Sequence, residues 1–206
     1  ASALAIVHGE AGHAGGSGLG IGGGVTMVVG RRGTIGSRRV QPGGGAPLDG
    51  ERAGSSDAAH AAALRLLTTR ARTRAELRQR LEGRGFEAAA VAEALDRLER
   101  VGLVDDAALA ELVAEGRAER GLDAPAIAAE LRGRGVDPAV AEQAAHTAVP
   151  PDARADRCRE VAEARLTQLA GLPAPTQLRR LATYLARRGY PPDLAETVAR
   201  DLVPLD

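Results

Sequence analysis

The sequence contains no lysine and no tryptophan, and its 206 residues include one cysteine, one phenylalanine and two tyrosines. The lone Cys158 excludes an internal disulfide framework and a zinc site built from several cysteines. Three aromatic rings cannot form a row of base-stacking platforms, which excludes RNA-recognition and OB-type surfaces. The 27 basic residues, all arginine, balance 27 acidic residues, so the chain is not a polybasic coat protein.

Long hydrophobic runs are also missing. No stretch reaches the ~20 apolar residues that a membrane span requires. The runs Ala3–Val7 and Val25–Val29 are short, and neither follows a basic region as in a secretory signal. We therefore expect a soluble, cytoplasmic protein that makes no membrane contact.

The first quarter of the chain differs in composition from the rest. Residues 1–56 hold 17 of the 26 glycines, whereas 21 of the 24 leucines lie beyond them. A segment with so few large apolar side chains cannot bury enough surface to offset its conformational entropy. We predict that residues 1–56 form a disordered, glycine-rich N-terminal arm. Met27, the only methionine, is a candidate for the authentic start.

Two features of this arm resemble ligand motifs. Gly18–Gly23 fits G-x-G-x-x-G, but glycine precedes it and no helix pattern follows, so we interpret it as a chance match. His8 and His13 flank Glu10 without a scaffold that could fix a metal geometry. Neither a nucleotide cofactor nor a metal is expected.

Helical periodicity governs the chain from Asp57 onward. Apolar residues recur three or four positions apart, as in the stripe Leu109, Leu112 and Val113. Thr73–Glu76 reads as a capping box, and Asp137 followed by proline is typical of a helix start. Six glycines stand where helices should end and where positive φ is convenient: Gly85, Gly102, Gly121, Gly135, Gly171 and Gly189. Because strand-type alternation never persists, we predict an all-α fold.

A pattern of the form Leu-x-x-Arg-Gly-apolar occurs three times, at 81–86, 131–136 and 185–190. We interpret each copy as a corner between two helices, in which the leucine anchors the first helix and the glycine reverses the chain. The apolar residue then packs at the start of the next helix. The spacing of 50 and then 54 residues predicts stacked units. We expect an elongated array of three tandem three-helix repeats, at 57–103, 104–149 and 150–206.

The zero net charge conceals local asymmetry. Residues 70–86 and 176–192 each carry +4, residues 87–119 carry −6, and residues 123–136 are neutral. Arginine binds phosphate or carboxylate through a planar fork, so the two basic segments are the expected contact surfaces. Most charge runs are nevertheless solvated helix faces, and for any single arginine that interpretation stays open. At the corners, Arg84, Arg134 and Arg188 fit a structural role toward helix-end carbonyls as well as ligand contact.

An ordered set of short segments spreads over about 150 of the 206 residues: Ala63–Leu67, Thr73–Leu77, Leu81–Phe86, Leu95–Leu98, Gly102–Asp106, Arg117–Gly121, Ala129–Val136 and Leu185–Tyr190. In order and spacing this set resembles the RecX family of bacterial regulatory proteins. The resemblance implies a modulator in the helical groove of the RecA–DNA filament, which spans neighbouring subunits. It would restrain ATP hydrolysis, strand exchange and co-protease activity, in the setting of DNA repair, recombination and the SOS response. The chain departs from the family at Leu109, where an aromatic is usual, and at Gly121–Ile127, which lacks the usual basic residues.

The candidate residues for contact with the filament or with DNA are Arg72, Arg74, Arg78, Arg80, Arg84, Arg117, Arg120, Arg132, Arg134, Arg179, Arg180, Arg187 and Arg188. We expect Tyr184 and Tyr190 to be partly buried by packing, and Cys158 to be a small buried hydrophobe.

The residues leave two other functions open. A helix–corner–helix pair could place a helix in the DNA major groove, as in a helix-turn-helix DNA-binding regulator. The chain could also be a generic helical scaffold that binds a protein. No catalytic motif is present, so we expect a non-enzymatic, monomeric regulator. Its expected partners are the RecA filament and the phosphates of single- or double-stranded DNA.

Overall fold

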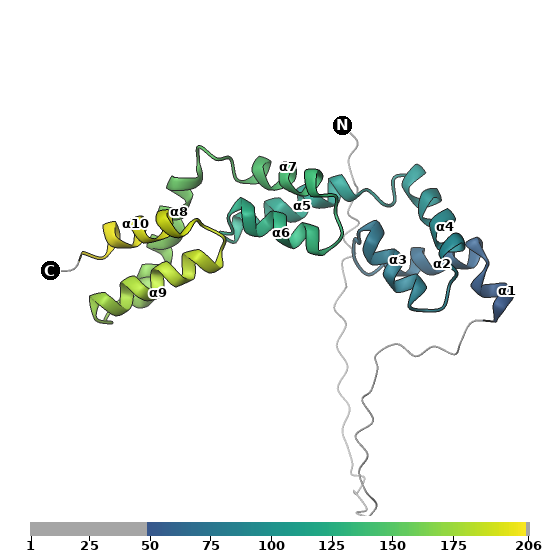
Figure 1. Ribbon diagram of the computed structural model, residues 1–206, viewed down its shortest axis with the longest axis horizontal. Helices are drawn as coiled ribbons and strands as arrows, with labels where there is room; N and C mark the ends of the chain where they lie inside the picture. The colour runs from purple at the N-terminus through teal and green to yellow at the C-terminus, as the bar shows by residue number, and fades with distance from the viewer. Residues whose placement is uncertain (1–48, 205–206) are drawn as a thin grey trace, which may run out of the picture. The chain divides into compact units, whose positions relative to one another are not determined.

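The computed structural model describes residues 49–204, which contain helices and no strand (Figure 1). The helices are α1 (Gly50–Ala53), α2 (Ser56–Leu67), α3 (Arg74–Glu82), α4 (Ala88–Arg100), α5 (Asp106–Glu119), α6 (Ala124–Gly133), α7 (Pro138–Ala148), α8 (Arg154–Leu166), α9 (Ala174–Arg187) and α10 (Pro192–Leu202). A short 3-10 helix, Thr167–Leu169, follows α8. The prediction of an all-α fold is confirmed. The expectations for Gly18–Gly23, for His8 and His13, and for Met27 lie outside the described residues.

The described helices bury three separate hydrophobic cores, each made by three consecutive long helices. Fully buried large side chains include Leu77, Leu81 and Leu95 in the first core, Ile127 and Leu131 in the second, and Leu181 and Leu185 in the third. Burying one such side chain stabilises the fold by about 1.5–3 kcal/mol. We propose that each core marks one unit: α2–α4 form the first, α5–α7 the second and α8–α10 the third.

The three predicted corners share one backbone geometry. In the first, the amide of Gly85 donates to the carbonyl of Glu82, and the amide of Phe86 donates to the carbonyl of Leu81. This pair of bonds is the Schellman helix end, which requires a left-handed residue at the glycine. The glycines have φ values of +94°, +81° and +91° at Gly85, Gly135 and Gly189. The leucine and the final apolar residue of every corner are buried, as the sequence predicted.

The predicted helix starts are also present. The Thr73 hydroxyl accepts from the Glu76 amide, and the Glu76 carboxylate accepts from the Thr73 amide, which completes the capping box. Asp137 caps α7 by accepting from Ala139 and Val140. These local bonds follow from residue type and spacing alone, which is why the sequence could predict them.

Three expectations need correction. Residues 50–56, assigned to the glycine-rich arm, form α1 and begin α2, whose N-cap is Ser55. Val104, assigned to the second unit, packs in the first core. In α5 the buried face consists of Ala110, Ala114 and Ala118, whereas Leu112 is 66% exposed. Small side chains let α6 and α7 approach α5 closely, so alanines form the centre of this face. Of the predicted stripe, Val113 packs at the edge of the core, Leu109 is half-buried and Leu112 faces solvent.

Candidate functional site

Arg72 and Arg74 hold the first unit together and are not free to bind a ligand. Arg72 is buried, and its Nε donates to the carbonyl of Leu66 at 3.3 Å; burial lowers its pKa. Arg74 forms ion pairs of 2.6 Å with Asp96 and 2.5 Å with Glu99, and hydrogen bonds to Glu99 and Asp96 raise its pKa. Both side chains therefore serve packing between α2, α3 and α4.

Two arginines of the second unit pair with acids of the same unit. Arg117 on α5 forms a two-pronged ion pair with Glu130 on α6, with distances of 2.6 and 2.7 Å. The hydrogen bond and charge of Arg117 lower the pKa of the Glu130 carboxyl. Arg132 lies 3.5 Å from Glu142 on α7. The charge balance of segment 123–136 therefore includes side chains held in ion pairs, Glu130 with Arg117 and Arg132 with Glu142.

The corner of the second unit docks on the first unit. The Thr73 hydroxyl donates to the carbonyl of Arg134 at 2.7 Å, and the Arg134 side chain pairs with Glu76 at 3.0 Å. Burial disfavours ionisation of Glu76, but the hydrogen bond and charge of Arg134 outweigh it and lower the pKa of that carboxyl. Gly135 lies so close to Ala75 that a Cβ atom there would come within 2.3 Å of the alanine Cβ. The corner therefore ends a helix and also joins two units.

The corner of the third unit docks on the second unit in the same way. The amide of Asp123, the N-cap of α6, donates to the carbonyl of Arg188 at 2.8 Å. A Cβ at Gly189 would lie 2.6 Å from the Cβ of Ala126. The fully buried Asp123 carboxylate also accepts from Arg154 of α8 at 3.1 Å. We call these two contacts the 1–2 junction and the 2–3 junction.

Of the remaining candidate arginines, Arg188 is half-buried and the other seven are exposed. Within residues 49–204 no ion pair or side-chain hydrogen bond engages Arg78, Arg80, Arg84, Arg120, Arg179, Arg180 or Arg187. We call this set the free arginines. An unpaired, hydrated guanidinium keeps all of its donors available for phosphate or carboxylate, which the arginines held in ion pairs do not.

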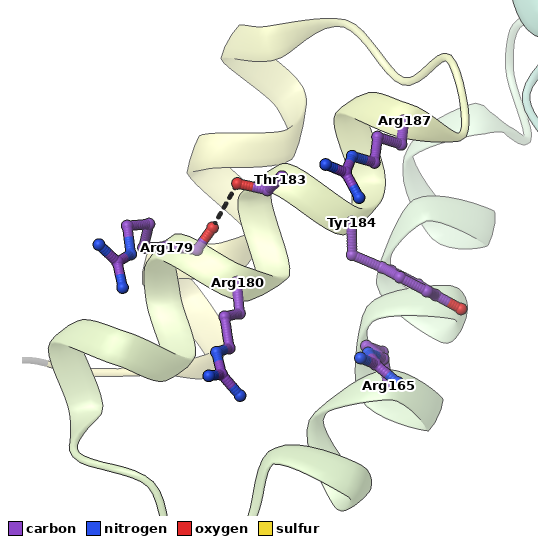
Figure 2. A pocket seen from close by; sticks show the side chains of 6 residues that line it. All are labelled: Arg165, Arg179, Arg180, Thr183, Tyr184 and Arg187. Atoms are coloured by element: carbon purple, nitrogen blue, oxygen red, sulfur yellow. Dashed lines mark hydrogen bonds between the residues drawn. The ribbon is translucent and has the colours of Figure 1, made fainter.

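A surface pocket of about 350 Å³ gathers three of the free arginines on the third unit. Arg179, Arg180, Thr183, Tyr184 and Arg187 come from α9, and Arg165 comes from α8 (Figure 2). The Thr183 hydroxyl donates to the backbone carbonyl of Arg179 at 2.8 Å (Figure 2), and Arg179, Arg180 and Arg187 are exposed to solvent. We call this the arginine pocket.

The electrostatics of the arginine pocket favour an anion. The guanidinium of Arg188 lies 3.9 Å from the centre of the Tyr184 ring, and that of Arg165 lies 4.9 Å from it. No acidic residue occurs between Glu163 and Asp193, so the sequence around the pocket supplies no neutralising charge. Two cations over one ring repel each other and are stabilised by the ring only in part. A phosphate or carboxylate bound in the pocket would neutralise the arginines that line it, Arg165, Arg179, Arg180 and Arg187.

Sequence reasoning missed Arg165. It lies on α8, outside the basic segment 176–192, and reaches the pocket only because α8 packs on α9. The available signal was the absence of acids from 164 to 192, which extends the basic region back to Arg165. The proposed corner role was also wrong in detail, because the Arg134 side chain binds Glu76 and the Arg188 side chain stacks on Tyr184 instead of reaching helix-end carbonyls.

A second pocket of about 480 Å³ lies at the 1–2 junction and is also rich in arginine. Its charged lining residues are Arg70, Glu76, Arg80, Arg132 and Arg134. Glu76 is already neutralised by Arg134, so the pocket presents excess positive charge. It brings together Arg80 and Arg132, which belong to different units.

Cys158 and possible metal ligands were the remaining candidates for chemistry in the described part of the chain. Cys158 is fully buried, and burial raises the pKa of its thiol to about 11, so it is a thiol and not a nucleophilic thiolate. Among residues 49–204 no group of three or more His, Cys, Asp and Glu could hold a metal ion. None of the helices described there is long and apolar enough to cross a membrane.

Comparison with known proteins decides the family. Residues 59–98 match the family model of the first three-helix domain of RecX, and residues 152–198 match that of the third. A regulatory protein RecX from Amycolatopsis mediterranei is 44% identical over 137 residues, which are 66% of this chain and 78% of that protein. The chain belongs to the RecX family. The resemblance seen in the sequence is thereby confirmed.

Other members of the RecX family agree. The regulatory protein RecX of Thermobifida fusca is 42% identical over 144 residues, covering 69% of this chain and 77% of that protein. The crystal structure of RecX from Lactobacillus salivarius superposes with a TM-score of 0.60 over 71% of this chain and 96% of that chain, at 20% identity, so it supports the fold. As a RecX family member the chain is a regulatory protein and not an enzyme.

Proposed function

We propose that this RecX family member binds in the groove of the RecA–DNA filament and slows RecA's ATP hydrolysis, strand exchange and co-protease activity. The observation that carries the proposal is the set of free arginines, which is split between the first unit, the end of α5 and the third unit. A filament of protein on DNA offers phosphates and carboxylates along its length. Arginine can bind both in a two-pronged way.

The junctions explain how separated arginines act together. Each junction combines a hydrogen bond from a helix N-cap with a glycine packed against an alanine. Such contacts set the spacing between the first and third units, so that both bind without a large loss of conformational freedom. A protein bound to neighbouring RecA subunits slows ATP hydrolysis if it binds the resting conformation of the filament more tightly than the conformation that the filament adopts during hydrolysis.

The experiment is a titration of RecA's DNA-dependent ATPase with the full chain. We expect slowing at fewer than one molecule per RecA subunit, with weaker inhibition as salt rises, because contacts to phosphate release counterions. An ATPase rate that stays unchanged at excess protein would refute the proposal.

The helix-turn-helix alternative is disfavoured by charge. The helix that follows each corner would enter the major groove, and these helices are α4, α7 and α10. All three carry a net negative charge, and α10 holds Asp193, Glu196 and Asp201 against Arg200. A recognition helix with this charge would be repelled by the phosphates. Sequence-dependent binding to duplex DNA without RecA would reverse this conclusion.

A further inference from the structure

Two of the three corners are interaction surfaces, and both dock on the same kind of partner. The partner in each junction is the first turn of a helix in the preceding unit, α3 in one and α6 in the other. In each, a donor at the N-cap residue binds the carbonyl of the corner arginine, and an alanine in the first turn lies against the corner glycine. In the 1–2 junction the acid Glu76 also pairs with the corner arginine Arg134.

The corner of the first unit has the same structure, but in the described part of the chain nothing donates to the Arg84 carbonyl and nothing lies against Gly85. Gly85 has φ +94°, and a Cβ built there would meet no atom within 4 Å. Arg84 is exposed and belongs to the free arginines. Residues 49–204 contain no three-helix unit ahead of the first one. The short helix α1 ends beside Glu87, just beyond the corner, where the Glu87 amide donates to the Ala53 carbonyl at 2.9 Å; it leaves Arg84 and Gly85 uncovered.

The third unit shows that a second copy does not supply the partner by stacking end to end in the way the units of one chain do. The helix equivalent to α3 and α6 in the third unit is α9, whose N-cap is Pro173. Proline has neither a backbone N–H nor a hydroxyl, so it cannot donate to a corner carbonyl as Thr73 and Asp123 do. The first turns of α3 and α6 are already occupied by corners of their own chain.

We propose that the first-unit corner, Arg84 and Gly85, docks on the first turn of a helix in a partner protein. The expected partner helix has Thr, Ser or Asp at its N-cap, alanine at its second or third position, and an acid that can pair with Arg84. This inference rests on the proposed function, under which the partner protein is RecA in its filament. Such docking would add a hydrogen bond to the Arg84 carbonyl and a close packing contact at Gly85 to a surface that otherwise binds through the charge of its arginines.

The test compares Gly85→Asn with Gly102→Asn. Gly102 also has positive φ, +70°, also has no atom within 4 Å of a built Cβ, and lies in a helix end of the first unit. Asparagine tolerates the left-handed conformation best among residues with a side chain, so both variants should fold and melt alike. Binding to preformed RecA filaments on single-stranded DNA is measured by sedimentation. We expect Gly85→Asn to weaken binding at least tenfold and Gly102→Asn to change it less than twofold.

Equal binding by the two variants would overturn the inference and leave the proposed function intact, whereas a wild-type chain that does not sediment with the filament would overturn both.

A second measurement locates the contact. In Glu82→Cys the new thiol is exposed beside the corner, while Cys158 is fully buried and does not react. A photo-crosslinker on this thiol should attach to the first turn of a RecA helix. Attachment to DNA, to a second copy or to residues 1–48 of the same chain would contradict the proposal.

Discussion

Replacing a corner glycine by alanine tests whether that corner joins two units or only ends a helix. Gly189 and Gly85 have almost the same φ, +91° and +94°, so alanine at either position pays the left-handed strain of about 1–2 kcal/mol. At Gly85 the added Cβ meets nothing within 4 Å. At Gly189 it would lie 2.6 Å from the Ala126 Cβ and 2.9 Å from the Ala126 amide nitrogen. Backbone cannot move aside as a flexible side chain can, so overpacking adds about 1–3 kcal/mol.

Gly189→Ala should therefore destabilise the protein by about 2–5 kcal/mol, against about 1–2 kcal/mol for Gly85→Ala. Urea unfolding followed by circular dichroism measures both, and the comparison uses transition midpoints because units of an array can unfold separately. Equal midpoint shifts for the two variants would refute the view that corners join units.

Three further outcomes follow from the structure. Glu76→Gln should lower the free energy of unfolding by about 1–3 kcal/mol at pH 7, because the ion pair with Arg134 is lost. The pKa of Glu76 is lower in the folded protein than its ordinary value of 4.5, so this stabilisation is present above pH 4.5 and is lost as the pH falls below it. The urea midpoints of variant and wild type should therefore converge in acid. Cys158 should resist a thiol reagent at pH 8 in the folded protein and react at once in urea, and fast labelling of the native chain would contradict its burial and its pKa of about 11. Leu112→Ala should change stability by less than about 0.5 kcal/mol, whereas Ala114→Leu should cost about 1–3 kcal/mol; the opposite order in thermal melts would mean that the α5 stripe was correctly predicted from its leucines.

The local features of the fold could be predicted from the sequence because they depend on residues close together in the chain. The capping box at Thr73–Glu76 spans four residues, and each corner spans six. A glycine after a helix with a buried leucine behind it specifies the same turn wherever it occurs. The composition of α5 defeated this reasoning, because alanine buries little area alone and its packing role depends on how near the neighbouring helices lie.

The candidate site was predictable only in part, because pairing between distant charges is a tertiary property. Arg134 meets Glu76, 58 residues earlier, and Arg74 meets Asp96 and Glu99, more than 20 residues later. The net charge of a short segment of sequence counts a paired arginine and a free arginine equally, so it cannot tell them apart. The same limitation hid Arg165, which joins the arginine pocket from a neighbouring helix.

The most direct test of the account compares two double variants of the third unit that remove equal charge. Arg180→Ala with Arg187→Ala takes two free arginines from the arginine pocket, whereas Arg159→Ala with Arg200→Ala takes two that are paired with Asp201 and Glu196. Sedimentation with preformed RecA–DNA filaments should show at least tenfold weaker binding for the pocket variant, which corresponds to a loss of about 1.4 kcal/mol, and nearly unchanged binding for the paired variant. Equal binding by both variants, at any salt concentration, would contradict the claim that unpaired arginines hold this protein on the filament.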